Sequence, residues 1–182
     1  MPIDSLMVPL GTPAPTFDLP TIDGGRVALD DLTARAVLVM FVCNHCPYVR
    51  HVEAELGRLA AEFADRDVAI VAVCSNDVES YPDDDVEHLR AQAARADWTF
   101  PYAVDETQEV ARAYNAACTP DYFLYGPDRT LAYRGALDES SPRNGKPLTG
   151  ELLREALEHV LAGEAVPEPH IPSMGCGIKW RA

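Results

Sequence analysis

Two cysteines, two residues apart, carry the most specific chemistry that this sequence offers. Cys43 and Cys46 lie in the stretch Val42-Cys43-Asn44-His45-Cys46-Pro47, after a continuous apolar run and before a helical pattern. Cysteines at this spacing, at a strand-to-helix junction, are typical of a reversible dithiol, because the N–H groups of a helix N-terminus stabilise a thiolate. The alternative is a pair of packed free thiols, which the spacing alone leaves open.

The elements that would position these thiols follow from hydrophobic periodicity. Residues 36–42 form an apolar run rich in β-branched side chains, which predicts a strand buried on both faces. Pro47 suits the first turn of a helix, where its missing N–H is not needed. An apolar stripe at helical spacing then follows, formed by Val49, Val52, Leu56, Leu59 and Phe63.

The rest of the pattern alternates short strands and helices. We expect an N-terminal hairpin (16–19 and 26–29), a buried strand (68–74), an edge strand (100–104), a second hairpin (122–125 and 130–133) and a last helix (152–161). The carboxylates at 83–85 suit the first turn of a helix that follows them. The order predicts an α/β fold with parallel strands in the first half and an antiparallel hairpin in the second.

The length of 182 residues suits one domain, which we place at residues 1–163, followed by a tail at 164–182 that packs on the same domain. A formal charge of −14 argues against a nucleic-acid surface and against binding to anionic membranes. No apolar run approaches the roughly 20 residues of a membrane span. The N-terminal residues do not resemble a signal peptide, so we expect a cytoplasmic location.

The five cysteines are an odd number, which in a reducing compartment argues against a structural disulfide framework. Catalysis, metal binding and packing remain. Cys74 ends a predicted core strand and Cys118 precedes a proline, and we expect both to pack as buried thiols. Cys176 lies in the tail and has three interpretations: a resolving or relay thiol, part of a docked tail anchored by Ile178 and Trp180, or a surface thiol.

Four features together carry a resemblance to a known family. They are the opening Gly11-Thr12-Pro13-Ala14-Pro15-Thr16-Phe17-Asp18-Leu19, the Cys43-Asn44-His45-Cys46 motif, Thr119-Pro120 before the second hairpin, and the closing Gly175-Cys176-Gly177-Ile178-Lys179-Trp180. The chain resembles the redoxin branch of the thioredoxin superfamily, the AhpC/TSA or peroxiredoxin-like proteins related to TlpA-type thiol-disulfide proteins. The resemblance implies a thioredoxin-like fold: a mixed central sheet flanked by helices, with an N-terminal β-hairpin extension and a C-terminal tail.

The resemblance also implies roles for the motif residues. Cys43 would be the nucleophile and the more exposed thiol, and Cys46, one helical turn in, would resolve the mixed disulfide. His45, and Asn44 beside it, would lie next to the reacting sulfur, where a His45 cation or donor would favour the Cys43 thiolate. Thr119-Pro120 would form a cis peptide bond that faces the dithiol and presents backbone to an extended substrate.

We therefore expect an oxidoreductase that acts through redox-active cysteines without a bound cofactor or metal. The first hypothesis is a thiol-disulfide oxidoreductase whose partners are protein or small-molecule disulfides and a thioredoxin-type or low-molecular-weight thiol reductant. The second is a peroxiredoxin-like thiol peroxidase with an antioxidant role, although relatives of that kind carry Thr or Ser three residues before the peroxidatic Cys, and Met40 stands three before Cys43. The third is a Cys/His module that binds metal and handles copper.

Overall fold

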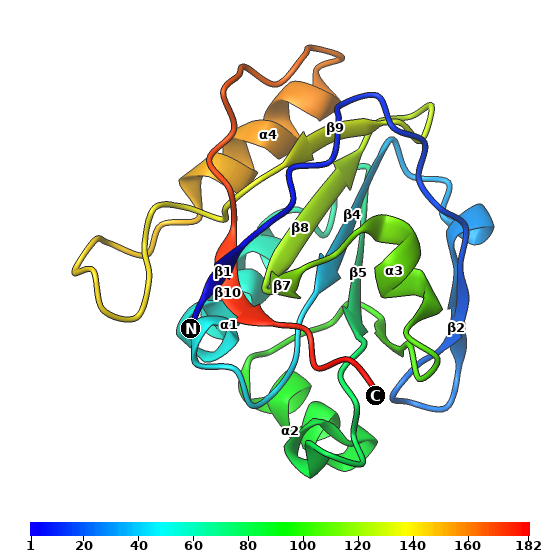
Figure 1. Cartoon of the computed structure of the whole chain (residues 1–182). Helices are drawn as coiled ribbons and strands as arrows, with labels where there is room; N and C mark the ends of the chain where they lie inside the picture. The colour runs from blue at the N-terminus through cyan, green and yellow to red at the C-terminus, as the bar shows by residue number, and fades with distance from the viewer.

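Strand β4 (Ala36–Phe41) runs through the centre of the protein, and the computed structural model describes all 182 residues around it. The main sheet has the strand order β6-β5-β4-β8-β9 (Figure 1). β4 pairs in parallel with β5 and antiparallel with β8, so the sheet is mixed, as predicted. The other four strands are β5 (Val68–Cys74), β6 (Tyr102–Val104), β8 (Asp121–Tyr125) and β9 (Leu131–Arg134).

Helices cover both faces of this sheet. They are α1 (Pro47–Glu62), α2 (Val86–Arg95), α3 (Glu109–Tyr114) and α4 (Glu151–Leu161). Because side chains alternate along a strand, Leu38 and Met40 of β4 pack in one apolar cluster with α1, α2 and α4. Val37 and Val39 face the other cluster, with α3 and the N-terminal segment. Burial on both faces explains why the sequence of β4 is apolar throughout.

Two smaller sheets flank the main one. An N-terminal hairpin pairs β2 (Asp18–Pro20) with β3 (Arg26–Ala28). The second small sheet joins β1 (Ile3–Asp4), β10 (Met174–Gly177) and β7 (Cys118–Thr119), in the order β1-β10-β7. The C-terminal strand therefore lies between the N-terminus and the segment before β8 (Figure 1).

The predicted elements agree with the observed ones. The strand at 68–74, both hairpins, the edge strand and the last helix are all present within two residues of the expected bounds. The stripe that begins at Val49 is buried, and Gly163 follows α4 with a φ of +73°. The short strands β1, β7 and β10 were not predicted.

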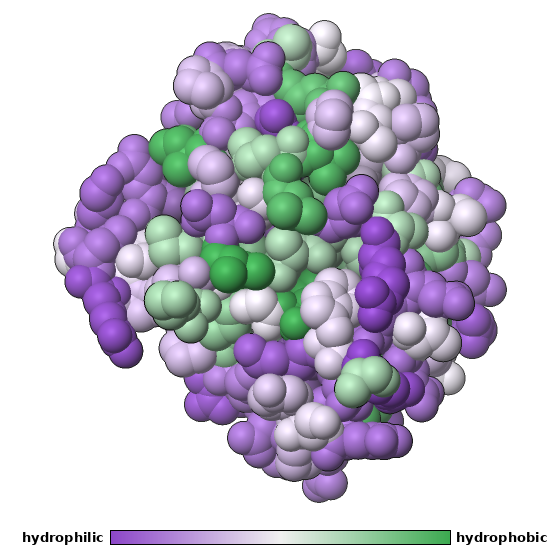
Figure 2. All heavy atoms as spheres, viewed as in Figure 1, coloured by the Kyte–Doolittle hydropathy of each residue, from purple (hydrophilic) through white to green (hydrophobic).

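The face seen in Figure 2 carries a band of apolar residues across its middle, bordered by polar ones. Large apolar side chains that stay exposed include Ile3, Leu6, Ile171 and Met174, which belong to the N-terminal segment and to the segment around β10. None of the helices combines the length and the apolar composition needed to cross a lipid bilayer.

Candidate functional site

The dithiol lies where β4 ends and α1 begins. Helix α1 starts at Pro47, which makes Cys46 its N-cap residue and leaves Cys43 in the loop before the helix. The expected position of Cys46 one turn inside the helix is therefore wrong, because proline at the first helical position starts the helix after Cys46. The positive end of the α1 dipole consequently lies at Cys46, whose side chain accepts no capping hydrogen bond.

The sulfur atoms of Cys43 and Cys46 both contact Thr119, which is distant in the sequence. Cys43 Sγ is 3.4 Å from Thr119 Oγ1, and the Cys46 thiol donates a hydrogen bond of 3.3 Å to the Thr119 carbonyl oxygen. The Thr119–Pro120 peptide bond is cis, as the resemblance implied. The fold thus brings four of the predicted site residues together: Cys43, Cys46, Thr119 and Pro120.

Neither thiol of the pair reaches the surface. Cys43 and Cys46 are both 0% exposed, so the exposure expected for Cys43 is not observed. The C-terminal strand pairs with β7 and brings Cys176 opposite Thr119, beside Cys46. Cys46 Sγ lies 2.8 Å from Cys176 Sγ, and Cys176 is only partly buried.

The electrostatics of the site favour a thiolate on Cys46. The neighbouring thiol of Cys43 first, and then that of Cys176, lower the pKa of Cys46 to about 5. The Thr119 carbonyl oxygen acts in the opposite direction, because it accepts a hydrogen bond only from the protonated thiol.

The Cys43 thiol has the opposite tendency. The neighbouring Cys46, burial and the negative charge of Asp84 together raise the pKa of Cys43 well above its usual value. The two pKa shifts therefore favour a thiolate on Cys46 and a protonated thiol on Cys43.

Asp84 anchors the motif loop, a role that its position in the sequence does not predict. Its Oδ1 accepts the backbone N–H groups of Asn44 (2.8 Å) and His45 (3.0 Å), and its Oδ2 accepts a bond from Asn76 (2.9 Å). The carboxylate side chain is fully buried. Asp85, the next residue, caps α2, so only that neighbour performs the helix-terminal role expected for this acidic stretch.

The imidazole of His45 also binds Asp84, not a sulfur. His45 Nδ1 lies 2.5 Å from Asp84 Oδ2, and the ring stacks on Tyr81 with centroids 5.3 Å apart. The hydrogen bond to Asp84 raises the pKa of His45. Burial alone would raise the pKa of Asp84, but the bonds from His45 and Asn76 hold it below its usual value. Because His45 and Asp84 neutralise one another, His45 gives Cys43 less cationic support than expected.

Asn44 secures the loop through its side chain as well. Its Nδ2 donates to the Asp83 carbonyl (2.7 Å), and its Oδ1 accepts a bond from Arg95 (2.6 Å). Both bonds hold the motif loop against the segment before α2 and against α2 itself.

Three side chains of the site carry atoms of the kinds that bind metal ions. Ligand atoms of Cys43, His45 and Asp84 all lie within 4.8 Å of one another. In this arrangement His45 Nδ1 and the Asp84 carboxylate bind each other, so an ion would have to replace their bond.

The remaining thiols are buried, as expected. Burial raises the pKa of Cys74 at the end of β5, and that of Cys118 in β7. Ile178 is 6% exposed and anchors the tail, whereas Trp180 is 40% exposed and lies under the guanidinium of Arg112.

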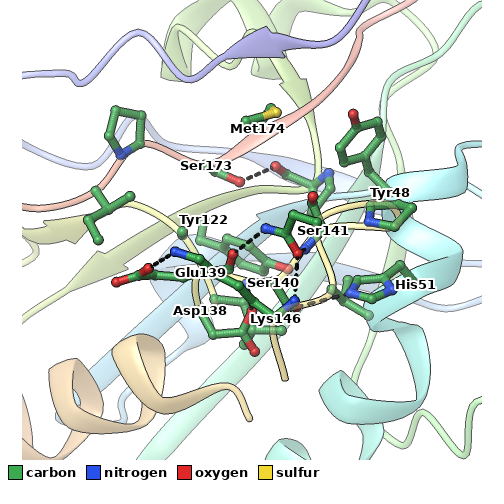
Figure 3. Close-up of a pocket in the computed structure, with 18 residues that line it drawn as sticks. Tyr48, His51, Tyr122, Asp138, Glu139, Ser140, Ser141, Lys146, Ser173 and Met174 are labelled. Atoms are coloured by element: carbon green, nitrogen blue, oxygen red, sulfur yellow. Dashed lines mark hydrogen bonds and ion pairs between the residues drawn. The ribbon is translucent and has the colours of Figure 1, made fainter. Parts of the chain in front are cut away.

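A pocket of about 250 Å³ opens beside the site, between the start of α1, the loop at 138–146 and the segment that enters β10 (Figure 3). Its walls include Tyr48, Pro120 and Met174, which lie one or two residues from the site residues Cys46, Thr119 and Cys176. Polar groups in the wall include His51, whose Nε2 is 3.0 Å from Ser140 Oγ, and the buried, unpartnered hydroxyl of Tyr122. No local sequence pattern predicts this pocket, because its walls come from distant segments.

Comparisons with known proteins give a consistent result. The AhpC/TSA family profile matches residues 10–134. The thioredoxin-like protein YneN of Bacillus subtilis is 30% identical over 114 residues, which span 63% of this chain and 64% of that protein, less than two thirds of its length.

Two solved structures extend the comparison. An uncharacterized conserved protein from Geobacillus kaustophilus is 49% identical with a TM-score of 0.97, over 100% of this chain and 97% of that one. The thioredoxin domain of a thiol-disulfide oxidoreductase from Bacteroides vulgatus is 18% identical with a TM-score of 0.65, over 84% of this chain and 99% of that one. The second likeness shows the fold, which is thioredoxin-like.

Proposed function

The chain belongs to the AhpC/TSA family and has a thioredoxin-like fold, and from this premise we propose that it is a thiol-disulfide oxidoreductase using Cys43 and Cys46. In the proposed cycle the two thiols form a disulfide as two electrons and two protons pass to a substrate disulfide. The same exchange runs in reverse when the protein disulfide oxidises a pair of thiols. Disulfides and thiols are the proposed substrates.

One observation carries this proposal. Both sulfurs of the pair converge on Thr119, and Cys46 is the N-cap residue of a 16-residue helix. A thiolate is the reactive form of cysteine, and a helix N-terminus with several hydrogen-bond donors stabilises it at neutral pH. We assign the thiolate to Cys46 and the role of its disulfide partner to Cys43. Stabilising the thiolate stabilises the reduced protein, which makes the disulfide a better oxidant.

The test is a redox titration in glutathione buffers, with disulfides mapped peptide by peptide. We expect a Cys43–Cys46 disulfide that closes over a defined range of buffer potential in the native protein. Cys43→Ser removes this disulfide. Cys74→Ala is the matched control, since Cys74 is a buried thiol outside the pair, and it should keep the disulfide.

Two outcomes would reject the proposal. One is a pair that stays reduced, or forms no mutual disulfide, across the whole range of buffers. The other is rapid oxidation by hydrogen peroxide together with slow disulfide exchange, which would favour the peroxidase alternative. Metal analysis of protein purified without chelators tests the metal-binding alternative in the same preparation.

A further inference from the structure

The C-terminal strand brings a third thiol to the buried pair. β10 pairs antiparallel with β7, with Cys176 opposite Thr119 and Gly177 opposite Cys118. The resulting Sγ–Sγ distance between Cys46 and Cys176 is 2.8 Å, across 130 residues of sequence. A disulfide needs about 2.05 Å between its sulfurs, so a small movement of side chains would suffice to form one.

The sequence of β10 fits this docking. A Cβ atom on Gly175 would lie 1.9 Å from the Thr119 carbonyl oxygen, so no larger residue could occupy that position with the strand in place. Ser173 Oγ donates a 2.6 Å hydrogen bond to the Pro120 carbonyl, and the N–H of Ile178 bonds to Ala117. Hydrogen bonds therefore hold the residues on either side of β10, and Gly175 within the strand allows close contact with Thr119.

This docking decides which sulfur a reactant can reach. Cys43 and Cys46 are 0% exposed, whereas Cys176 is partly exposed. The backbone of β7 beside the thiols, where an extended polypeptide could pair, is already occupied by β10. A small molecule can reach the partly exposed sulfur of Cys176 without entering the buried pair and without pairing with β7.

We propose that Cys176 is a third redox-active thiol, through which the buried pair exchanges electrons with low-molecular-weight thiols and disulfides. This inference rests on the proposed function, because it assumes the Cys43–Cys46 disulfide. The proposed reactant at the surface is a small thiol compound.

The steps balance when the oxidised protein meets two molecules of a thiol RSH. The Cys176 thiolate attacks Cys46 Sγ, the Cys43–Cys46 bond breaks, and Cys43 leaves and takes up a proton. RS⁻ then attacks Cys176 Sγ, the new Cys46–Cys176 bond breaks, and Cys46 leaves as a thiolate. A second RS⁻ attacks the R-bearing sulfur of the mixed disulfide, which forms RSSR and releases Cys176. Two thiols become one disulfide and the protein gains two electrons. One of the two thiol protons remains on the protein and the other passes to solvent, because Cys46 stays a thiolate.

The pKa values favour the step that releases Cys46. The preceding step, in which Cys176 attacks and Cys43 leaves, is the slower one, because the pKa values of both thiols are raised. Burial and the neighbouring Cys46 raise the pKa of Cys176 to about 12, while that of Cys46 is lowered. A low-pKa thiolate is the better leaving group, so an incoming thiol that attacks the Cys46–Cys176 disulfide at Cys176 expels Cys46 readily. Lys179 lies close enough for its charge to act on Cys176 and favours an incoming anion there.

The first experiment oxidises the native protein and Cys176→Ser, and then follows their reduction by glutathione with acid quenching and disulfide mapping. We expect both proteins to form the Cys43–Cys46 disulfide. Cys176→Ser should be reduced at least about tenfold more slowly, because exchange depends on access to the sulfur under attack. A transient glutathione adduct should map to Cys176 in the native protein. Cys74→Ala should behave as the native protein does.

The outcomes separate the two proposals. If Cys176→Ser is reduced at the native rate, or if the adduct maps to Cys43 or Cys46, the role of Cys176 is rejected and the dithiol function stands. If the Cys43–Cys46 disulfide forms in neither protein, the proposed function fails, and the relay that depends on it fails too.

A second pair of variants tests the docking without removing a thiol. In a Cys43→Ser background, oxidised glutathione should trap a Cys46–Cys176 disulfide. Gly175→Ala should abolish this product by displacing β10, and should make Cys46 more reactive toward iodoacetamide. Gly177→Ala is the control on the same strand, since a Cβ there would meet only Ile3 Cδ1 at 3.4 Å, an ordinary contact. Equal trapping in the two glycine variants would contradict the inference.

Discussion

The carboxylate of Asp84 holds His45 at two points, the backbone N–H at 3.0 Å and the imidazole Nδ1 at 2.5 Å. These two contacts make Asp84, which precedes α2, an anchor for the loop that carries both cysteines. Its negative charge also acts on Cys43 and contributes to the raised pKa of that thiol. One residue thus fixes the loop and helps to decide which cysteine ionises.

Asp84→Asn should destabilise the protein and loosen the motif loop. The amide has a single acceptor oxygen, so it cannot accept all four hydrogen bonds that the carboxylate accepts from Asn44, His45 and Asn76. Because buried bonds to a charged group each contribute about 1.5–3 kcal/mol, we expect a loss of about 2–3 kcal/mol in the free energy of unfolding. Urea denaturation measures it.

The control for this change is Asp85→Asn, at the next position. Asp85 is half-buried and caps α2 through the N–H of His88. Asn caps a helix as well as Asp does, so this variant loses only a charge at the helix N-terminus and should cost about 0.3–0.5 kcal/mol. A similar loss in both variants would mean that Asp84 acts only as another surface carboxylate.

His45 should titrate above its usual pKa of 6.5, because it binds Asp84. A pKa that is raised in the folded state adds stability below pH 6.5, and this contribution disappears as the pH rises through the folded value. NMR of the imidazole proton resonances measures the shift directly. In Asp84→Asn the pKa of His45 should fall back toward its usual value. An unchanged titration in that variant would show that some other group sets it.

One thiol of the reduced protein should have a much lower pKa than the others. With a pKa of about 5, Cys46 should be a thiolate throughout the range from pH 7 to 9, and it should become protonated as the pH falls through 5. Thiolate absorbance at 240 nm, recorded against pH, should show this step in the native protein and lose it in Cys46→Ser. Persistence of the step in Cys46→Ser would assign the thiolate to another cysteine.

The central part of the fold was predictable because its signals are local. β4 and β5 are continuous apolar runs, and α1 has a regular apolar stripe after a proline, so each segment shows its environment in its own residues. The strands β1, β7 and β10 have only two to four residues each. Their pairing joins Cys176 to Thr119, and no local pattern indicates such a contact.

The site was predictable to a similar extent. Cys43, Cys46 and Thr119-Pro120 stand in short motifs that can be recognised in the sequence. Asp84 was missed because it lies between two other acidic residues and resembles a solvated helix start. A helix needs only one N-cap residue, and Asp85 is the N-cap of α2. The further carboxylates beside it therefore indicated a second role for this acidic stretch.

Gly57→Ala should destabilise the protein, although alanine is the better helix former. Gly57 lies inside α1, and a Cβ there would be 2.1 Å from the carbonyl oxygen of Ala96, the residue that ends α2. Overpacking costs about 1–3 kcal/mol, which exceeds the roughly 0.5–1 kcal/mol that alanine gains over glycine in a helix.

The same change should also reach the site. Because α2 begins shortly after Asp84, displacement of α2 should weaken the bond to His45 and lower the pKa of its imidazole. Thermal unfolding and NMR titration of one preparation measure both effects. Gly126→Ala is the matched control, since a Cβ there would have its nearest neighbour at 3.6 Å. A stabilised Gly57→Ala would mean that helix propensity outweighs the contact, and that α1 and α2 are not held together at this point.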